Sequence, residues 1–321
     1  MHVRPGRPDR ARPSGAAATA AFLCLALTAL GAAPATAVQP LSPSPTLASP
    51  SGGSARSLGG PVVYAHRGAS AYAPENTLES IDRAMALGFD WVENDVQRTR
   101  DGVLVVIHDD TLTRTTDVKR VFPDHGPWRV KDFTAAEIAR LDAGSWFDKR
   151  FAGARVPTLR EYMERVGRNQ QRLLLELKEP EAYPGIERQI LDLLDELGWL
   201  DEPHVTRRLV VQSFSADSIR TVHALRPDPR TAFLGTPNVA DLPRYAAFTD
   251  QINPQHTTIS AGWVAAVHRL LGAHGKPMEV DTWIVDDAAT ARKVKEMGVD
   301  GIITNAPDVV RHAVGPLQAF G

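Results

Sequence analysis

Cysteine is almost absent from this chain of 321 residues, in which Cys24 is the only one. Cys24 lies in an apolar stretch near the N-terminus that we expect to be removed, so the mature protein would contain none. This absence excludes disulfides, thiolate zinc ligands and a cysteine nucleophile. The mature protein must therefore be held together by its hydrophobic core, for which it is long enough.

Three further absences reduce the number of functions that are compatible with the sequence. The formal net charge is only −2, so there is no excess of positive charge for nucleic acid or an anionic membrane. The chain has no phosphate-binding G-x-x-x-x-G-K-[ST] loop, which argues against a nucleotide kinase or ATPase. Apart from the N-terminal run, no apolar segment is long enough to span a bilayer. We expect no nucleic-acid partner and no stable membrane insertion of the mature chain.

The first 60 residues have the pattern of an exported protein. Arginines precede an apolar run from about Ala16 to Ala33, and Ala35-Thr36-Ala37 follows as an A-x-A cleavage pattern. We predict a signal peptide over residues 1–37, cleaved after Ala37. An uncleaved anchor is the alternative, but the run is short and rich in alanine. Residues 38–60 are rich in Pro, Ser and Gly and predict a disordered linker. The expected location is extracellular or periplasmic.

The remaining residues, 61–321, show the alternation of an α/β domain. Short β-branched runs predict strands at 62–65, 91–96, 173–178, 209–212, 231–234, 251–253, 279–285 and 301–304. Amphipathic stretches predict helices at 77–87, 159–166, 184–197, 216–225, 262–273 and 288–297. This repeated βα unit favours a (β/α)₈ TIM barrel, with a doubly wound sheet as the alternative fold.

One stretch interrupts the rhythm of strands and helices. Residues from about 109 to 157 show no clean βα period and contain Trp128, Trp146, Phe147 and Phe151. A long insertion after a barrel strand would stand over the end where TIM barrels hold their active sites. We therefore expect this segment to form a cap that shapes a pocket.

Acidic side chains sit within two of the predicted strands. Glu93 and Asp95 are two residues apart on a strand and so point to the same face. Glu176 lies in a leucine-rich run, where an unpaired buried acid is costly. Adjacent strands would bring the three carboxylates together, and three oxygen-bearing groups suit one divalent cation, Ca²⁺ or Mg²⁺, rather than zinc. Export favours Ca²⁺.

Two histidines and two cations complete the candidate site. His66 and His108 each follow an apolar run, at the end where the acids lie, and imidazoles exchange protons near neutral pH. Arg67 and Lys178 supply positive charge that suits a phosphate. Together these groups indicate metal-assisted phosphoryl transfer. Asn76 has the pattern of a helix N-cap, and we expect it to be mainly structural.

At this point the sequence resembles the glycerophosphodiester phosphodiesterase family. The resemblance covers residues 62 to 310 and rests on several specific motifs. They are His66-Arg67-Gly68, Pro74-Glu75-Asn76-Thr77, Glu93-x-Asp95-Val96, Asp101-Gly102, His108-Asp109, Arg114-Thr115-Thr116, Glu176-Leu177-Lys178 and Gly301-Ile302-Ile303-Thr304 with Pro307-Asp308.

The resemblance implies a TIM barrel with a small insertion after the second strand. It implies that Glu93, Asp95 and Glu176 bind the divalent ion, and that His66 and His108 act as acid and base. It assigns the phosphate to Arg67 and Lys178, and Trp283 packs either against the glycerol backbone or in the core. The implied activity is hydrolysis of glycerophosphodiesters, such as glycerophosphocholine, to sn-glycerol 3-phosphate and an alcohol. Either histidine suits either role, and the nucleophile is water or a neighbouring glycerol hydroxyl.

Two positions depart from the usual pattern of the family. Ile284-Val285-Asp286 stands where the family often has Thr-Val-Asn, and Asn305 stands where it often has Asp. We expect neither position to carry the chemistry, but both to lie near the substrate pocket and to bear on which alcohol is accepted.

Rival functions share the same residues. A phospholipase D-like enzyme acting on lysophospholipids or sphingomyelin would need an apolar ring around the pocket, which Trp128, Trp146 and Phe147 would form. A hydrolase of teichoic acid fits an exported protein. A non-catalytic phosphodiester-binding protein is disfavoured, because a decayed site would have lost a histidine or an acid, and all are present.

Overall fold

The computed structural model describes residues 59–315. The predicted signal peptide and all but the last two residues of the predicted linker lie outside the described residues. Their cleavage and disorder therefore stay predictions.

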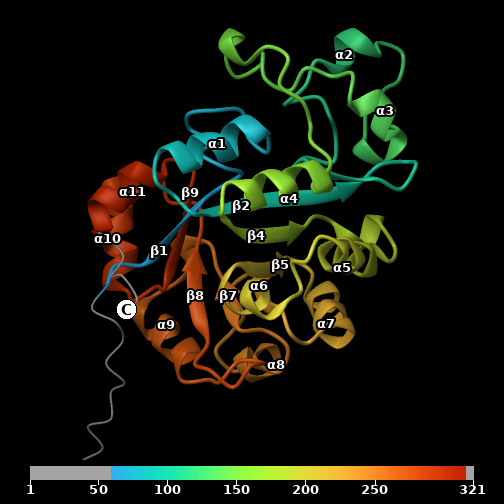
Figure 1. Cartoon of the computed structure of the whole chain (residues 1–321). Coiled ribbons are helices and arrows are strands. Elements are labelled where there is room, and N and C mark those ends of the chain that lie inside the picture. The colour runs from blue at the N-terminus through green and yellow to red at the C-terminus, as the bar shows by residue number, and fades with distance from the viewer. Residues whose placement is uncertain (1–58, 316–321) are drawn as a thin grey trace, which may run out of the picture. The chain divides into compact units, whose positions relative to one another are not determined.

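Eight parallel strands close into a barrel, which confirms the predicted fold (Figure 1). Going round it, the order is β1, β9, β8, β7, β6, β5, β4 and β2, and β2 pairs with β1 to close the ring. These strands are β1 (Val62–Ala65), β2 (Trp91–Arg98), β4 (Arg172–Leu177), β5 (Leu209–Ser213), β6 (Arg230–Leu234), β7 (Gln251–Asn253), β8 (Glu279–Thr282) and β9 (Gly301–Thr304). The predicted strand at 279–285 thus ends three residues early.

Helices surround the barrel and bury apolar side chains. In α4, Leu159, Tyr162, Met163 and Val166 are buried at helical spacing, and Thr158 begins the helix with a capping box. The surrounding helices are α1 (Leu78–Ala86), α4 (Leu159–Arg168), α5 (Ile186–Glu196), α6 (Glu202–Arg207), α7 (Ala216–Leu225), α8 (Leu242–Ala246), α9 (Ala261–His268), α10 (Ala288–Glu296) and α11 (Pro307–Val314), with 3₁₀ turns η3 (Pro180–Ala182) and η4 (His256–Thr258). Within residues 59–315, no helix is long and apolar enough to cross a membrane.

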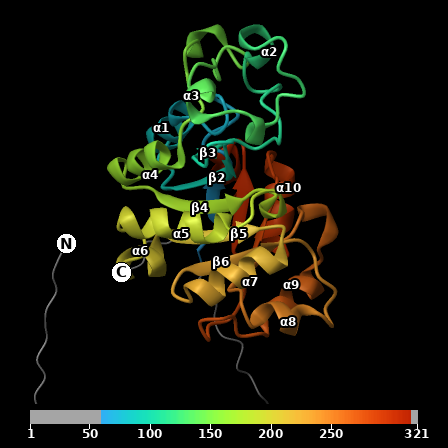
Figure 2. The same cartoon turned by 90° about the vertical axis from the view of Figure 1, so that its right-hand side faces the viewer.

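The predicted insertion stands beside one end of the barrel (Figures 1 and 2). It is preceded by β3 (Leu104–Val106), which runs antiparallel to β2 and is therefore not a barrel strand. The short elements α2 (Val118–Val121), η1 (Val130–Asp132), α3 (Ala135–Ile138) and η2 (Lys149–Phe151) follow. The insertion has a small core of its own that includes Leu112, Phe133, Ile138 and Leu141.

The turn after β1 needs glycine at position 68. Gly68 has a φ of +79°, which disfavours side chains. A Cβ there would lie 2.3 Å from Ser80 Oγ and 2.6 Å from the Ser80 carbonyl carbon. Helix α1 thus packs directly on this turn, and Ser80 Oγ donates a hydrogen bond of 2.8 Å to the carbonyl of Arg67. The contact fixes where the residues before Gly68 lie.

We predict that Gly68→Ala lowers the free energy of unfolding by about 2–4 kcal/mol, through backbone strain and overpacking together. Gly102→Ala is the matched control, because Gly102 also has a positive φ, of +87°, but a Cβ at that position would have nothing within 4 Å of it. The free energy of unfolding of that variant should fall by only about 1 kcal/mol. Urea unfolding measures both, and equal losses would contradict the packing argument.

Candidate active site

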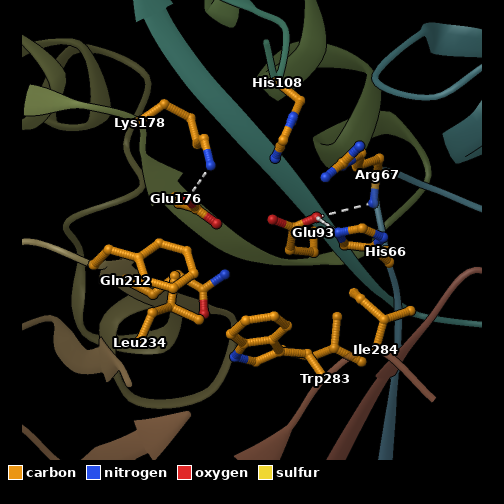
Figure 3. Close-up of a pocket in the computed structure, with 12 residues that line it drawn as sticks. His66, Arg67, Glu93, His108, Glu176, Lys178, Gln212, Leu234, Trp283 and Ile284 are labelled. Carbon is orange, nitrogen blue, oxygen red and sulfur yellow. Dashed lines mark hydrogen bonds and ion pairs between the residues drawn. The ribbon is translucent and has the colours of Figure 1, made fainter. Parts of the chain in front are cut away.

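Three buried carboxylates form the centre of the site. Glu93 and Asp95 come from β2, and Glu176 lies directly opposite Asp95 on the neighbouring β4. One oxygen of each lies within 4.8 Å of the others. We call these three residues the acidic triad. Figure 3 shows Glu93 and Glu176 facing the same space. The sequence-based expectation that adjacent strands unite the three acids is confirmed.

The environment of the acidic triad opposes its full ionisation. Burial, with the charges of the other two acids, raises the pKa of Glu93 well above its ordinary value. Burial and Asp95 raise the pKa of Glu176 to about 7, although Lys178 opposes the shift. Burial alone would raise the pKa of Asp95, but Arg67 and other positive groups outweigh burial and lower this pKa. Without further positive charge, three ionised acids at this distance are costly.

The donor set fits a divalent cation. Asp95 Oδ1 is buried without a hydrogen-bond donor, and Lys178 Nζ lies 3.9 Å from it. A buried oxygen left without a donor is expensive unless a cation approaches it. Three carboxylates with water are the ligands that Ca²⁺ and Mg²⁺ prefer. The acidic triad would therefore hold such an ion.

Both predicted histidines reach the same pocket (Figure 3). His66 follows β1, and its Nε2 lies 3.9 Å from Glu93 Oε2. Burial, followed by the charge of Arg67, lowers the pKa of His66 to about 4, so the ring is neutral at pH 7. His108 follows β3, and its Nδ1 lies 2.8 Å from Asp109 Oδ1.

The two predicted cations also line this pocket and touch the acidic triad. Arg67 Nε lies 3.2 Å from Asp95 Oδ2, and Lys178 Nζ lies 2.8 Å from Glu176 Oε1. Arg67 has a φ of +52°, an uncommon conformation for a residue with a side chain. Its backbone N–H donates to Glu93 Oε2 at 2.9 Å. The strained turn thus brings both its amide and its guanidinium to the acids.

Asn76 has a role that the sequence analysis missed. Thr77, not Asn76, is the N-cap of α1, and its Oγ1 accepts a hydrogen bond from Ser80 N. Asn76 is buried with a φ of +57°, and its Nδ2 donates to Asp95 Oδ2 at 2.8 Å. The expectation that Asn76 is the N-cap was wrong, because Thr77 caps the helix and Asn76 takes the left-handed conformation that asparagine tolerates. Asn76 orients an acid of the triad.

A charged bridge joins the insertion to the barrel. Arg114 donates through Nη1 to Glu75 Oε2 and through Nε to Asp109 Oδ2, both at 2.7 Å. Glu75 also accepts from Arg67 Nη1 at 2.8 Å. The bridge therefore holds Asp109, the neighbour of His108, in place. The side chains lie close in space although Arg114 is far from Glu75 in sequence.

Asn305 contacts a histidine of the site directly. Its Oδ1 lies 2.7 Å from His66 Nδ1, and its Nδ2 donates to Asp286 Oδ2 at 2.7 Å. Asp286 and Asn305 both belong to the two places where the sequence departs from the family pattern. Their contacts confirm that they lie near the pocket, directly behind His66, and the expectation that neither carries the chemistry stays a prediction.

The pocket has a charged wall and an apolar wall around about 400 Å³ of open space (Figure 3). The apolar wall consists of Phe214, Leu234, Trp283, Ile284 and Ile303. Trp283 Nε1 donates to the carbonyl of Asn253 at 2.8 Å, which fixes its ring.

The aromatic ring expected around the pocket is not formed by the insertion. Trp128 packs against the insertion's own core, and Trp146 and Phe147 contact each other. None of the three lines the pocket. Their hydrophobicity was visible in the sequence, but their packing partners were not.

The barrel and this site define a class of protein: an α/β-barrel hydrolase of phosphate esters, with an acidic cation site beside two imidazoles. Comparison with known families agrees with that class. Residues 66–309 match the model of the glycerophosphoryl diester phosphodiesterase family. The chain belongs to this family and is a phosphoric diester hydrolase.

Known relatives match more than three quarters of this chain. A glycerophosphodiester phosphodiesterase of Bacillus subtilis is 33% identical over 77% of this chain and 84% of its own length. One from Caldanaerobacter subterraneus is 35% identical over 79% of this chain and 97% of its own. Among solved structures, an Oleispira antarctica phosphodiesterase in complex with the product sn-glycerol-3-phosphate is 29% identical, with a TM-score of 0.68 over 79% of this chain and 97% of that one.

We predict that the stability of the metal-free protein falls as pH rises from about 4.5 to 7, partly because of Glu176. The folded-state pKa of about 7 lies above the ordinary glutamate pKa of 4.5, so the folded state binds more protons in this window and loses that advantage as pH rises. The contribution is on the order of 2–3 kcal/mol.

Urea unfolding in chelator at several pH values measures this slope. Glu176→Gln cannot titrate and should show a shallower fall between pH 4.5 and 7. Glu296→Gln, at an exposed position of α10, is the control and should follow the wild type. Equal slopes for wild type and Glu176→Gln would contradict the assignment.

Proposed function

We propose that the protein is a cation-dependent glycerophosphodiester phosphodiesterase that releases sn-glycerol 3-phosphate and an alcohol. The observation that carries this proposal is one pocket lined by two imidazoles, two cations, Glu93 and Glu176, with Asp95 completing the acidic triad beside it. The product named in the Oleispira antarctica structure agrees with this substrate class.

Each charged side chain has a place in the proposed reaction. Arg67 and Lys178 bind the anionic phosphodiester, and the guanidinium of Arg67 is also held against Glu75. Glu93, Asp95 and Glu176 would hold one divalent cation, Ca²⁺ or Mg²⁺. When bound there, the ion would neutralise negative charge on the phosphate and favour attack at phosphorus.

The two histidines move the protons. One imidazole removes the proton from the nucleophile as the new P–O bond forms, and the other protonates the alcohol oxygen as the old P–O bond breaks. Water as nucleophile gives sn-glycerol 3-phosphate directly. A neighbouring glycerol hydroxyl gives a cyclic phosphate, which water then opens.

The apolar wall receives the carbon skeleton of the substrate. Trp283 presents its ring to the pocket, and Phe214 stands beside it with ring centroids 5.6 Å apart. Phe214 is 51% exposed, and Lys178 Nζ lies 5.5 Å from the centroid of its ring. This exposed apolar edge favours a second candidate, an activity on lysophospholipids, whose chains would extend past it.

Export is part of the proposal and rests on residues 1–37. The basic start, the apolar run and the A-x-A pattern indicate a signal peptide. The enzyme would then act outside the cytoplasm, where Ca²⁺ is the more available ion.

We predict that residues 38–321 release sn-glycerol 3-phosphate from glycerophosphocholine with Ca²⁺ or Mg²⁺ and not with chelator. An enzymatic assay for sn-glycerol 3-phosphate measures it, and ³¹P NMR of the mixture detects any cyclic phosphate. No release with either ion would contradict the proposal. Turnover of lysophosphatidylcholine alone would favour the second candidate.

We also predict that His66→Ala and His108→Ala each lower turnover by about 10²–10⁴-fold. His204→Ala is the matched control, because His204 lies in α6 and does not line the pocket. Circular dichroism should show that all three variants are folded. Near-full activity in a folded His66→Ala protein would remove His66 from the mechanism.

A further inference from the structure

Behind His66 lies a chain of hydrogen bonds that the proposed reaction does not by itself explain. Asn305 follows β9, and its Oδ1 lies 2.7 Å from His66 Nδ1. Ser70 Oγ donates to the same oxygen at 2.7 Å. Asp286 stands on the far side of Asn305 and accepts from Asn305 Nδ2 at 2.7 Å. The order is carboxylate, amide, imidazole.

The direction of each hydrogen bond in this chain is determined by chemistry. An ionised carboxylate only accepts, so the amide nitrogen of Asn305 must face Asp286 and its oxygen must face His66. Asp286 is itself held by two further donors, the backbone N–H of Asn305 at 2.8 Å and Thr304 Oγ1 at 3.0 Å. The amide of Asn305 therefore has one orientation.

That orientation selects one form of the imidazole. A carbonyl oxygen only accepts, so Nδ1 of His66 must carry the hydrogen. A neutral imidazole has a single N–H, which leaves Nε2 with a lone pair. Nε2 is the atom that faces the acidic triad, 3.9 Å from Glu93 Oε2.

We propose that Asp286 and Asn305 are positioning residues, which hold His66 in the orientation and tautomer that present an unprotonated Nε2 to the reaction centre. In this tautomer the ring accepts a proton from the nucleophile at Nε2, which is the role of a base. The inference rests on the proposed function only for that last step. The tautomer itself can be measured without turnover.

The test is Asp286→Asn, which changes one oxygen to an NH₂ group. The remaining side-chain oxygen can still accept from Thr304 and the backbone of Asn305. The introduced NH₂ then faces the NH₂ of Asn305, and two donors cannot pair. Asn305 must turn its amide, so that NH₂ faces His66 Nδ1 and favours the other tautomer.

The spectroscopic result expected is a change in the ¹⁵N signals of one histidine. In the metal-free wild type at pH 7.5, Nδ1 of His66 should show the shift of a protonated ring nitrogen and Nε2 that of an unprotonated one. In Asp286→Asn the two should exchange. The signals are assigned to His66 by their loss in His66→Gln.

The kinetic result expected is a fall in kcat of about 10- to 100-fold with KM little changed, because a general base in the wrong tautomer loses part of its contribution. The double variant Asp286→Asn with Asn305→Asp should restore both tautomer and kcat. There the introduced amide donates to the introduced carboxylate, which accepts from His66 Nδ1.

Asp287→Asn is the matched control. Asp287 is the N-cap of α10 and accepts from the N–H groups of Ala289 and Thr290, and asparagine caps equally well. It should leave tautomer and kcat unchanged.

An unchanged tautomer in folded Asp286→Asn would overturn the proposal. A double variant in which His66 does not have the wild-type tautomer would also overturn it. If the single variant does not fold, the tautomer measured in the double variant serves as the test. An exchanged tautomer with unchanged kcat would support the positioning and contradict the base role that this inference gives to His66, while leaving the proposed function in place.

Discussion

Repulsion among three buried carboxylates is the constraint on which the rest of the site depends. Glu93, Asp95 and Glu176 come within 4.8 Å of one another inside a barrel, where burial strengthens their mutual repulsion. The positive groups of the pocket are directed at them. Arg67 approaches with its guanidinium and its backbone amide, and Lys178 approaches Glu176. A divalent cation completes this balance, and the same charge can act on a phosphodiester.

The backbone around the acidic triad is shaped by the same need. Arg67, Asn76 and Glu179 all have positive φ values, and each adjoins a residue of the site or belongs to it. Such conformations are costly and persist where surrounding contacts enforce them, often at functional sites. Close packing of α1 on Gly68 enforces the first of these turns. Arg114 extends the charge network into the insertion, so the insertion stabilises the site without lining the pocket.

The barrel could be predicted because it depends on local patterns. Each predicted run became a strand, and the expected adjacency of the strands that carry Asp95 and Glu176 is found. What could not be predicted depends on contacts between distant segments. Asn305 meets His66 across 239 positions of sequence, and Asn76 resembled a cap because both roles suit asparagine at a helix start. Trp128 could be recognised as apolar from the sequence, but the core against which it packs forms only when the insertion folds.

The most direct measurement is calorimetric titration of the metal-free protein, residues 38–321, with Ca²⁺ and with Mg²⁺ in two buffers of different ionisation enthalpy. The raised pKa values of Glu93 and Glu176 mean that binding must release protons. The account predicts one ion per chain, proton release on binding, and loss of binding in Glu93→Gln. Absence of binding by either ion, or binding unaffected by Glu93→Gln, would contradict it.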